Sequence, residues 1–336
     1  MQIICIKNEI EEILMKRKII FGAVVSILML GFAACTMVTG SKIDNKKDLE
    51  KIKVMTSIYP IKEFTEIIGG DKVSVKSMVP DGAEPHDFEP KAKDMVELGK
   101  SQLFIYNGLG MEHWVDKVLS TVHDDKLTVV DTSKNAKIIE VSNEKEVEIH
   151  DEDGYNHEHT QGDGHNHGKL DPHIWLSFSE AKNQGKLIEE ALIKVDPKDK
   201  NYFIANYNKF ANDLDQVSQE YGEKFKNIPN KSFVTGHAAF AYLCRDLGLT
   251  QISVEDAFGE GEITPQHLKE LADYCKTNNV KVIFMPDSAS EKVSQTLANE
   301  VGAKVVKISS LETKNGDKSY IETMKENLET IYDNLK

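Results

Sequence analysis

The sequence predicts an α/β protein with two lobes, each built on a mostly parallel sheet flanked by helices and joined by one long helix. Two observations support this prediction. Short apolar and β-branched runs alternate with amphipathic helical patterns in both halves of the chain, which is typical of parallel sheets. A single long helical pattern, residues 198–226, separates the halves. At 336 residues the chain is long enough for two domains.

In the first half, five short runs of apolar and β-branched residues are expected to form strands. They are residues 52–60, 72–80, 101–108, 126–131 and 136–141. Amphipathic helical patterns lie between several of them, as in IKEFTEIIGG (61–70), where the glycines end the pattern. This half, residues 52–175, is the predicted N-terminal lobe.

A helical region, residues 176–228, follows and links the lobes. It begins with SFSEAKNQGKLIEEALIKVDP, a helix that Pro197 closes. In the longer pattern, apolar residues recur every three or four positions: Phe203, Tyr207, Phe210, Leu214, Val217, Tyr221 and Phe225. A helix of this length extends about 40 Å. Its apolar stripe is expected to pack against the protein and not to bind a cofactor.

The second half, residues 229–336, repeats the alternation and is the predicted C-terminal lobe. Strands are expected at 231–236, 250–254, 280–285 and 303–309, with helices such as TPQHLKELADYCKT between them. The halves share this architecture without an evident residue-level repeat. Cys244 and Cys275 fall in helical patterns of this lobe, where buried thiols are expected and a disulfide is the alternative.

The N-terminus carries an export signal. From Met15, three bases precede an apolar run, Ile19–Leu30, and then small residues and Cys35. This order is that of a secretory signal peptide, and the apolar run is short for a membrane span. FAAC resembles a bacterial lipobox, so we expect Cys35 to be lipidated. Residues 1–35 are the predicted leader, with Met15 as its expected true start, and 36–51 are a predicted flexible tether.

The formal net charge of −14 argues against a nucleic-acid-binding protein, which would normally carry a basic surface. The surplus of carboxylates suits a soluble protein that meets cations, although ordinary solubility explains it equally well. The net charge therefore argues against nucleic-acid binding and does not indicate any other function.

Three histidines stand at or beyond the ends of predicted strands. His86 follows the strand predicted at 72–80, His173 precedes a helix, and His237 comes directly after a strand. Ligands of open parallel sheets bind outside the carboxyl ends of the strands. A proline fixes the backbone directly before His86 and before His173. Any one of these residues could be a structural histidine, but three in equivalent positions favour a metal site.

Four motifs together resemble the metal-binding lipoproteins of zinc and manganese ABC importers. They are PHDFEP, DPHIWLS, TGHAAFAYL and the tail YIETMKENLETIYDNL, and they occur in the family's order over residues 52–336. The resemblance implies two α/β lobes joined by a rigid long helix, with the metal held in the cleft between them. Small lobe motion is expected, because the linker is a helix.

The motif match implies His86 and His173 as metal ligands from the first lobe and His237 from the second. A fourth donor, where one is present in the family, follows the strand matched by VKVIFMPDSASEK. Asp287 is the carboxylate at that place and is the expected ligand, with Glu291 or a water as alternatives.

The donor set favours zinc over manganese. Three neutral imidazoles with one carboxylate or water suit tetrahedral Zn²⁺, whereas Mn²⁺ prefers more oxygen donors. Manganese-type relatives typically have a glutamate in place of the third histidine, which here is His237. Zinc is therefore the expected metal, and manganese is the alternative.

Residues 150–168, HDEDGYNHEHTQGDGHNHG, form a histidine-rich segment with five of the chain's eleven histidines. These are His150, His157, His159, His165 and His167. Neutral imidazoles can hold zinc loosely and release it as the pH falls near 6.5, and zinc-uptake relatives often carry such an insertion. An accessory metal-scavenging or metal-sensing loop is expected, with a dispensable solvated loop as the alternative.

The predicted function is capture without chemistry. An exported monomer, lipid-anchored to the outer face of the cytoplasmic membrane of a Gram-positive-type bacterium, binds Zn²⁺ and delivers it to an ABC permease driven by a cytoplasmic ATPase. A zinc-dependent hydrolase is the enzymatic alternative, but the sequence has neither HExxH nor GxSxG. A surface adhesin is a further alternative, which no motif excludes.

Overall fold

The computed structural model describes residues 51–122, 126–141, 170–257 and 264–336. Three predicted features lie outside these residues: the leader with Cys35, the tether up to residue 50, and the histidine-rich segment. Within the described ranges, no helix has both the length and the apolar composition needed to cross a membrane.

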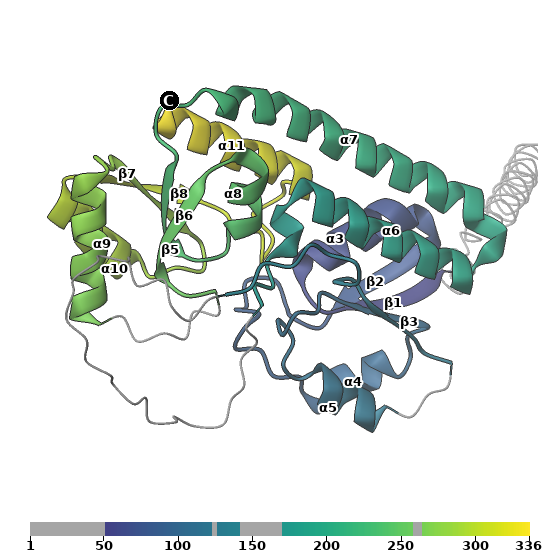
Figure 1. Ribbon diagram of the computed structural model, residues 1–336. Coiled ribbons are helices and arrows are strands. Elements are labelled where there is room, and N and C mark those ends of the chain that lie inside the picture. The colour runs from purple at the N-terminus through teal and green to yellow at the C-terminus, as the bar shows by residue number, and fades with distance from the viewer. Residues whose placement is uncertain (1–50, 123–125, 142–169, 258–263) are drawn as a thin grey trace, which may run out of the picture. The chain divides into compact units, whose positions relative to one another are not determined.

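Two parallel four-stranded sheets form the frame of the described chain (Figure 1). The first has the order β2-β1-β3-β4, with β1 Ile52–Thr56, β2 Val73–Ser77, β3 Leu103–Tyr106 and β4 Thr128–Asp131. The second has the order β6-β5-β7-β8, with β5 Ser232–His237, β6 Thr250–Glu255, β7 Val282–Pro286 and β8 Lys304–Ile308. Both sheets therefore use one strand order, which confirms the predicted pair of parallel sheets.

The strand predicted at 136–141 is wrong. In this stretch Glu140 makes only an isolated antiparallel bridge, with Leu170. The run is apolar but lies at the surface, where Ile138 is 46% exposed. It therefore lacks the two buried faces of an inner parallel strand.

Helices cover both faces of each sheet. The helices that pack into a core common to both lobes are α3 Tyr59–Gly69, α6 Phe178–Val195, α7 Lys200–Lys226, α8 Ala241–Leu247 and α11 Tyr320–Leu335. The opposite faces are covered by α4 Ala92–Leu98 and α5 Val115–Thr121 on the first sheet, and by α9 Pro265–Thr277 and α10 Glu291–Val301 on the second. Three short 3₁₀ helices are also described: η1 Gly70–Lys72, η2 Ile174–Leu176 and η3 Pro197–Asp199.

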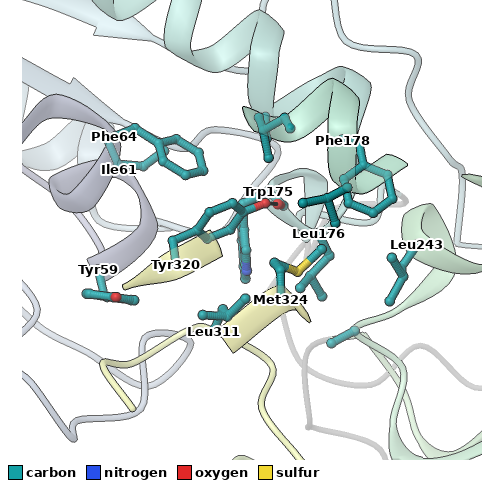
Figure 2. Packing of buried hydrophobic residues seen from close by; sticks show 14 of the residues in the cluster. Tyr59, Ile61, Phe64, Trp175, Leu176, Phe178, Leu243, Leu311, Tyr320 and Met324 are labelled. Carbon is teal, nitrogen blue, oxygen red and sulfur yellow. Dashed lines mark hydrogen bonds between the residues drawn. The ribbon is translucent and has the colours of Figure 1, made fainter. Parts of the chain in front are cut away.

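One hydrophobic cluster, the shared core, runs through both lobes. It takes Leu103 from the first sheet and Phe284 from the second, whereas the next residue along β3, Phe104, points to the outer face. Figure 2 shows Trp175 among side chains of both lobes, including Phe64 from α3 and Tyr320 from α11. Residues 51–336 accordingly form one compact unit.

The long helix α7 spans 27 residues and contacts helices of both lobes. Six residues of the predicted apolar stripe are buried, and the seventh, Tyr207, is partly buried against the same core. The stripe therefore packs against the protein, as the period of three to four residues predicted.

Cys244 and Cys275 are buried free thiols, as expected. Cys244 lies in the shared core and Cys275 in the cluster under α9 and α10, on opposite faces of the second sheet. Burial raises the pKa of Cys275 to about 11, which makes this thiol unreactive at neutral pH.

Candidate metal centre

His86 lies in the loop that leaves the first sheet after β2. The loop is fixed at its start, where the N–H groups of Met78 and Val79 donate to the backbone carbonyls at the end of β1, those of residues 56 and 57, at 2.8 and 3.0 Å. Nearer the site, the backbone N–H of His86 donates to Glu84 Oε1 at 3.3 Å. The proline before His86 restricts the backbone further. His86 is only 9% exposed.

His173 is held by contacts from both lobes. Asp171 Oδ1 accepts hydrogen bonds from the backbone N–H of His173 at 2.9 Å and from its ring Nδ1 at 2.8 Å. The carbonyl of Pro172 accepts from Asn107 Nδ2 at 2.9 Å, and the carbonyl of Asp171 accepts from the Tyr242 hydroxyl at 2.8 Å. Because Nδ1 donates to a carboxylate, the neutral form of the ring carries its lone pair on Nε2, the atom that lies nearest His237 and Glu312.

His237 is the last residue of β5, and its side chain is buried. Gly236, the residue before it, lies so close to the segment after β7 that a Cβ there would be 2.7 Å from Ala289 Cβ. A side chain at position 236 would therefore push apart the strand end that carries His237.

Glu312 lies in the loop between β8 and α11 and completes a cluster of four buried side chains. One donor atom each from His86, His173, His237 and Glu312 lies within 4.8 Å of all the others. The distances are 3.4 Å between His237 Nε2 and His173 Nε2, 3.2 Å between His173 Nε2 and Glu312 Oε1, and 3.5 Å between His237 Nε2 and Glu312 Oε1.

These distances match a tetrahedral zinc site. Donors at 2.0–2.1 Å from a tetrahedral zinc are roughly 3.3 Å from one another. Three of the donor atoms therefore already lie at three corners of such a tetrahedron. The ring of His86 lies beside these donors, with its centroid 5.4 Å from that of His173 and 5.8 Å from that of His237, and one of its nitrogens is within 4.8 Å of the other three donor atoms.

Burial and charge act differently on the titratable groups of the site. Burial, together with the neighbouring His173, lowers the pKa of His86 to about 3. Burial alone would lower the pKa of His173, but its hydrogen bonds with Asp171 and Glu312 outweigh burial and raise that pKa to about 9. Burial and the charge of Glu312 raise the pKa of Glu84 to about 7. The histidines hold the pKa of Glu312 well below its ordinary value, against the effect of burial.

Asp287, the expected fourth donor, is not in the cluster. It is exposed, and its carboxylate accepts hydrogen bonds from Ser309 and Ser310. The alternative, Glu291, is the exposed first residue of α10. Glu312 was missed, although it also follows a predicted strand of the second lobe and the rule that ligands lie beyond carboxyl strand ends applies to it equally.

Fold and site together define a class of protein. Four buried protein donors from two α/β lobes make up a group that could hold a divalent metal ion, which defines the class as a two-lobed metal-binding protein. The chain belongs to the family described as zinc-uptake complex component A, periplasmic, which it matches over residues 54–334.

Individual relatives agree with this family. The chain is 36% identical over 318 residues to the high-affinity zinc uptake system protein ZnuA of Bacillus subtilis, covering 93% of this chain and 96% of that protein. It is 35% identical over 286 residues to the zinc-binding protein AdcA of Streptococcus pyogenes, covering 84% of this chain and 55% of AdcA. The chain thus spans about half the length of AdcA.

Among solved structures, the laminin-binding protein Lmb of Streptococcus agalactiae has the same fold. It matches with a TM-score of 0.73 at 31% identity, over 85% of this chain and 100% of that one. That structure is described as a bifunctional protein with adhesin and metal-transporting activity.

Proposed function

We propose that this protein captures Zn²⁺ between its two lobes and delivers it to an ABC permease driven by a cytoplasmic ATPase. The proposed ligands are His86, His173, His237 and Glu312. The observation that carries the proposal is the 3.2–3.5 Å spacing of three buried donor atoms, which corresponds to the edges of a zinc tetrahedron. The family's description as a zinc-uptake component supports the same metal.

The donor set favours zinc over manganese as the cargo. Three nitrogen donors and one carboxylate suit a four-coordinate ion, whereas Mn²⁺ prefers more oxygen ligands. Competition between the two ions for the purified protein tests this choice, and a preference for Mn²⁺ at equal concentrations would reverse it.

In this proposal the protein is exported by its leader, anchored through a lipid on Cys35 and monomeric. The description of the family as periplasmic supports export, and a relative named as a zinc-binding lipoprotein, AdcA of Streptococcus pneumoniae, supports the anchor. The five histidines of the histidine-rich segment are proposed as an accessory zinc store.

Binding without catalysis is the proposed activity. Catalytic zinc sites keep one position open for water, whereas the four proposed ligands fill a tetrahedral shell. Laminin binding is a property stated for Lmb, and no contact in the described part of this chain favours it as a second function.

The first test is zinc affinity after removal of one ligand. If about 10–16 kcal/mol of zinc binding is shared among four ligands, His237→Ala loses roughly 3 kcal/mol, or about 100-fold in affinity. Competition titration with a chelator measures this loss, and His267→Ala, on the outer helix α9, is the matched control. Near-native affinity of His237→Ala would contradict the assignment.

The delivery step and the accessory store need separate measurements. A strain that lacks the gene should regain growth in zinc-depleted medium with the wild-type chain but not with His237→Ala. Deleting residues 150–168 should leave one bound zinc and remove only weaker sites. Unchanged zinc stoichiometry at all zinc concentrations would remove the accessory role.

A further inference from the structure

We propose that Asp287 is a positioning residue for zinc capture: it holds the loop Ser309–Glu312 so that the Glu312 carboxylate lies in the site before the metal arrives. This inference rests on the proposed role of Glu312 as a zinc ligand. Asp287 itself is not a ligand in this proposal. It acts two residues away from Glu312, on the backbone that carries it.

Asp287 makes three hydrogen bonds to the loop, here called the Glu312 loop. Its Oδ1 accepts from the backbone N–H of Ser310 at 2.9 Å and from the Ser310 hydroxyl at 2.8 Å. Its Oδ2 accepts from the Ser309 hydroxyl at 3.1 Å. Hydrogen bonds to a charged acceptor are stronger than those between neutral groups, so this one side chain contributes to the position of the loop through three contacts.

Two further side chains hold the same loop from other directions. Asn327 of α11 accepts from the backbone N–H of Ser309 at 2.9 Å and donates to its carbonyl at 2.6 Å. The Trp175 indole N–H donates to the carbonyl of Ser310 at 2.9 Å. Trp175 lies two residues after His173, so the loop that carries Glu312 is tied directly to the segment that carries a histidine of the other lobe.

The backbone of the loop is strained at one residue, although the Leu311 N–H donates to the Ser309 hydroxyl at 3.1 Å within the loop. Leu311, the residue before Glu312, has a φ of +58°, in the left-handed region that a leucine rarely adopts. Its side chain is fully buried in the shared core, where Figure 2 shows it near Tyr320 and Trp175. Such a conformation is unfavourable for a leucine and persists only where surrounding contacts fix it. The contacts to Ser309 and Ser310 supply that fixation.

Removal of the Asp287 side chain should change both the zinc affinity and the geometry of the site. If Asp287 is removed, the backbone N–H of Ser310 loses its acceptor and Leu311 can relax to negative φ, which moves the Glu312 carboxylate. Loss of a partner that orients a metal ligand typically lowers metal affinity 10–100-fold. The site should then resemble one in which Glu312 no longer binds.

The experiment compares Asp287→Ala with Asp287→Asn, Glu312→Ala and Asp131→Ala in the purified protein. Asp131 is the matched control: it is the last residue of β4 in the first lobe, and it also accepts from a serine N–H, at 2.9 Å, and from a serine hydroxyl, at 2.6 Å. Zinc affinity is measured by chelator competition, and the visible spectrum of bound Co²⁺ reports coordination geometry. Thermal unfolding of the metal-free protein measures folding separately.

We expect Asp287→Ala to bind zinc 10–100-fold more weakly, with a Co²⁺ spectrum shifted towards that of Glu312→Ala. Asp287→Asn keeps one acceptor oxygen for Ser310 and should recover most of the affinity. Asp131→Ala should leave affinity and spectrum unchanged.

Wild-type zinc affinity in Asp287→Ala, beside weakened Glu312→Ala, would overturn the positioning role and leave the proposed ligand set intact. An equal loss in Asp287→Asn and Asp287→Ala would also overturn it, because the charge and not the hydrogen bonds would then matter. Wild-type affinity in Glu312→Ala would overturn the fourth ligand itself, and with it the role of Asp287.

Discussion

The two lobes have the same strand order but supply the residues of the buried donor cluster from only partly equivalent places. His173 comes after the fourth strand of the first lobe and precedes α6, and Glu312 comes after the fourth strand of the second lobe and precedes α11. The other two differ, because His86 follows a second strand, β2, and His237 ends a first strand, β5. The repeated fold thus supplies equivalent positions at the carboxyl strand ends, and the sequence fills them differently.

The residues that hold the segments of His173 and Glu312 also come from equivalent positions. Asn107 is the first residue after β3, and Asp287 is the first after β7. Asn107 donates to the carbonyl of Pro172, beside His173, and Asp287 accepts from Ser310, near Glu312. The surroundings differ, because Asn107 is fully buried and Asp287 is exposed. The segment of His173 is therefore held by a buried hydrogen-bond network in the first lobe, whereas the segment of Glu312 is held by an exposed carboxylate in the second lobe.

The largest expected effect is on zinc affinity, and it differs between His173 and Glu312, the two residues that follow a fourth strand. His173→Ala should weaken zinc binding by roughly 3 kcal/mol, or about 100-fold, because no other group of the site can replace a fully buried imidazole. Glu312→Ala should cost less, since a water can occupy a fourth position at zinc. Chelator competition on both variants measures the difference, and a greater loss in Glu312→Ala would reverse this order.

The second prediction uses a buried carboxylate of the first-lobe network. Glu112 accepts from the backbone N–H groups of Asn107 at 2.8 Å and Gly108 at 3.0 Å. Burial raises its pKa to about 7, although these hydrogen bonds oppose the shift. A carboxyl whose folded pKa is raised stabilises the fold fully below its unfolded pKa, near 4.5, and loses that contribution as the pH rises through about 7.

Urea unfolding of the metal-free protein at pH 5 and pH 8 tests this sign. The raised pKa of Glu112 corresponds to a decrease in unfolding free energy on the order of 3 kcal/mol from pH 5 to pH 8. Glu112→Gln removes the titration, so its own decrease should be smaller than that of the wild type by about this amount. Equal decreases in both proteins would show that Glu112 titrates in its ordinary range.

The third prediction concerns Asn107. Asn107→Ala leaves the carbonyl of Pro172 without this donor and removes one of the two acceptors of Gln184 Nε2, the other being the Thr132 hydroxyl. Loss of buried hydrogen bonds of this kind costs about 1–3 kcal/mol of stability, and zinc affinity should fall about 10-fold because His173 is less firmly placed. Asn183→Ala, which removes one exposed hydrogen bond to the Lys134 carbonyl, should change neither quantity appreciably. Unchanged zinc affinity in Asn107→Ala would show that Asn107 does not position His173 in the way proposed for Asp287 and Glu312.

Much of the fold could be predicted from the sequence because its signals are local. The apolar run 280–285 corresponds to β7, Val282–Pro286, and the pattern 198–226 corresponds to α7, Lys200–Lys226. Strand and helix periods depend only on neighbouring residues. The run 136–141 failed because its pattern resembles a strand, while burial, which the sequence does not state, decides its structure.

The fourth residue of the site could not be predicted in the same way. Asp287 and Glu312 both follow strands of the second sheet, so strand-end placement alone does not choose between them. The choice depends on the left-handed backbone at Leu311 and on the side chains that fix it. Nothing in the local sequence SSLE marks its leucine for positive φ, and the fixing contacts come from residues far away in the chain.

The smallest expected effect concerns a hydroxyl that joins the lobes. Tyr242 of α8 donates to the carbonyl of Asp171 at 2.8 Å and accepts from the N–H of Ile139 at 3.1 Å. Tyr242→Phe keeps the ring and removes both hydrogen bonds, so the unfolding free energy should fall by about 1 kcal/mol. Urea unfolding measures this loss.

The zinc affinity of Tyr242→Phe should fall by less than the roughly 10-fold expected for Asn107→Ala, because Asp171 still holds the imidazole of His173 directly. Tyr274→Phe is the matched control, since its hydroxyl contacts Ser232 at 3.1 Å within the second lobe alone. It should lower stability slightly and leave zinc binding unchanged. If Tyr242→Phe weakened zinc binding as much as Asn107→Ala, the position of His173 would depend on contact between the lobes as much as on the first lobe's own network.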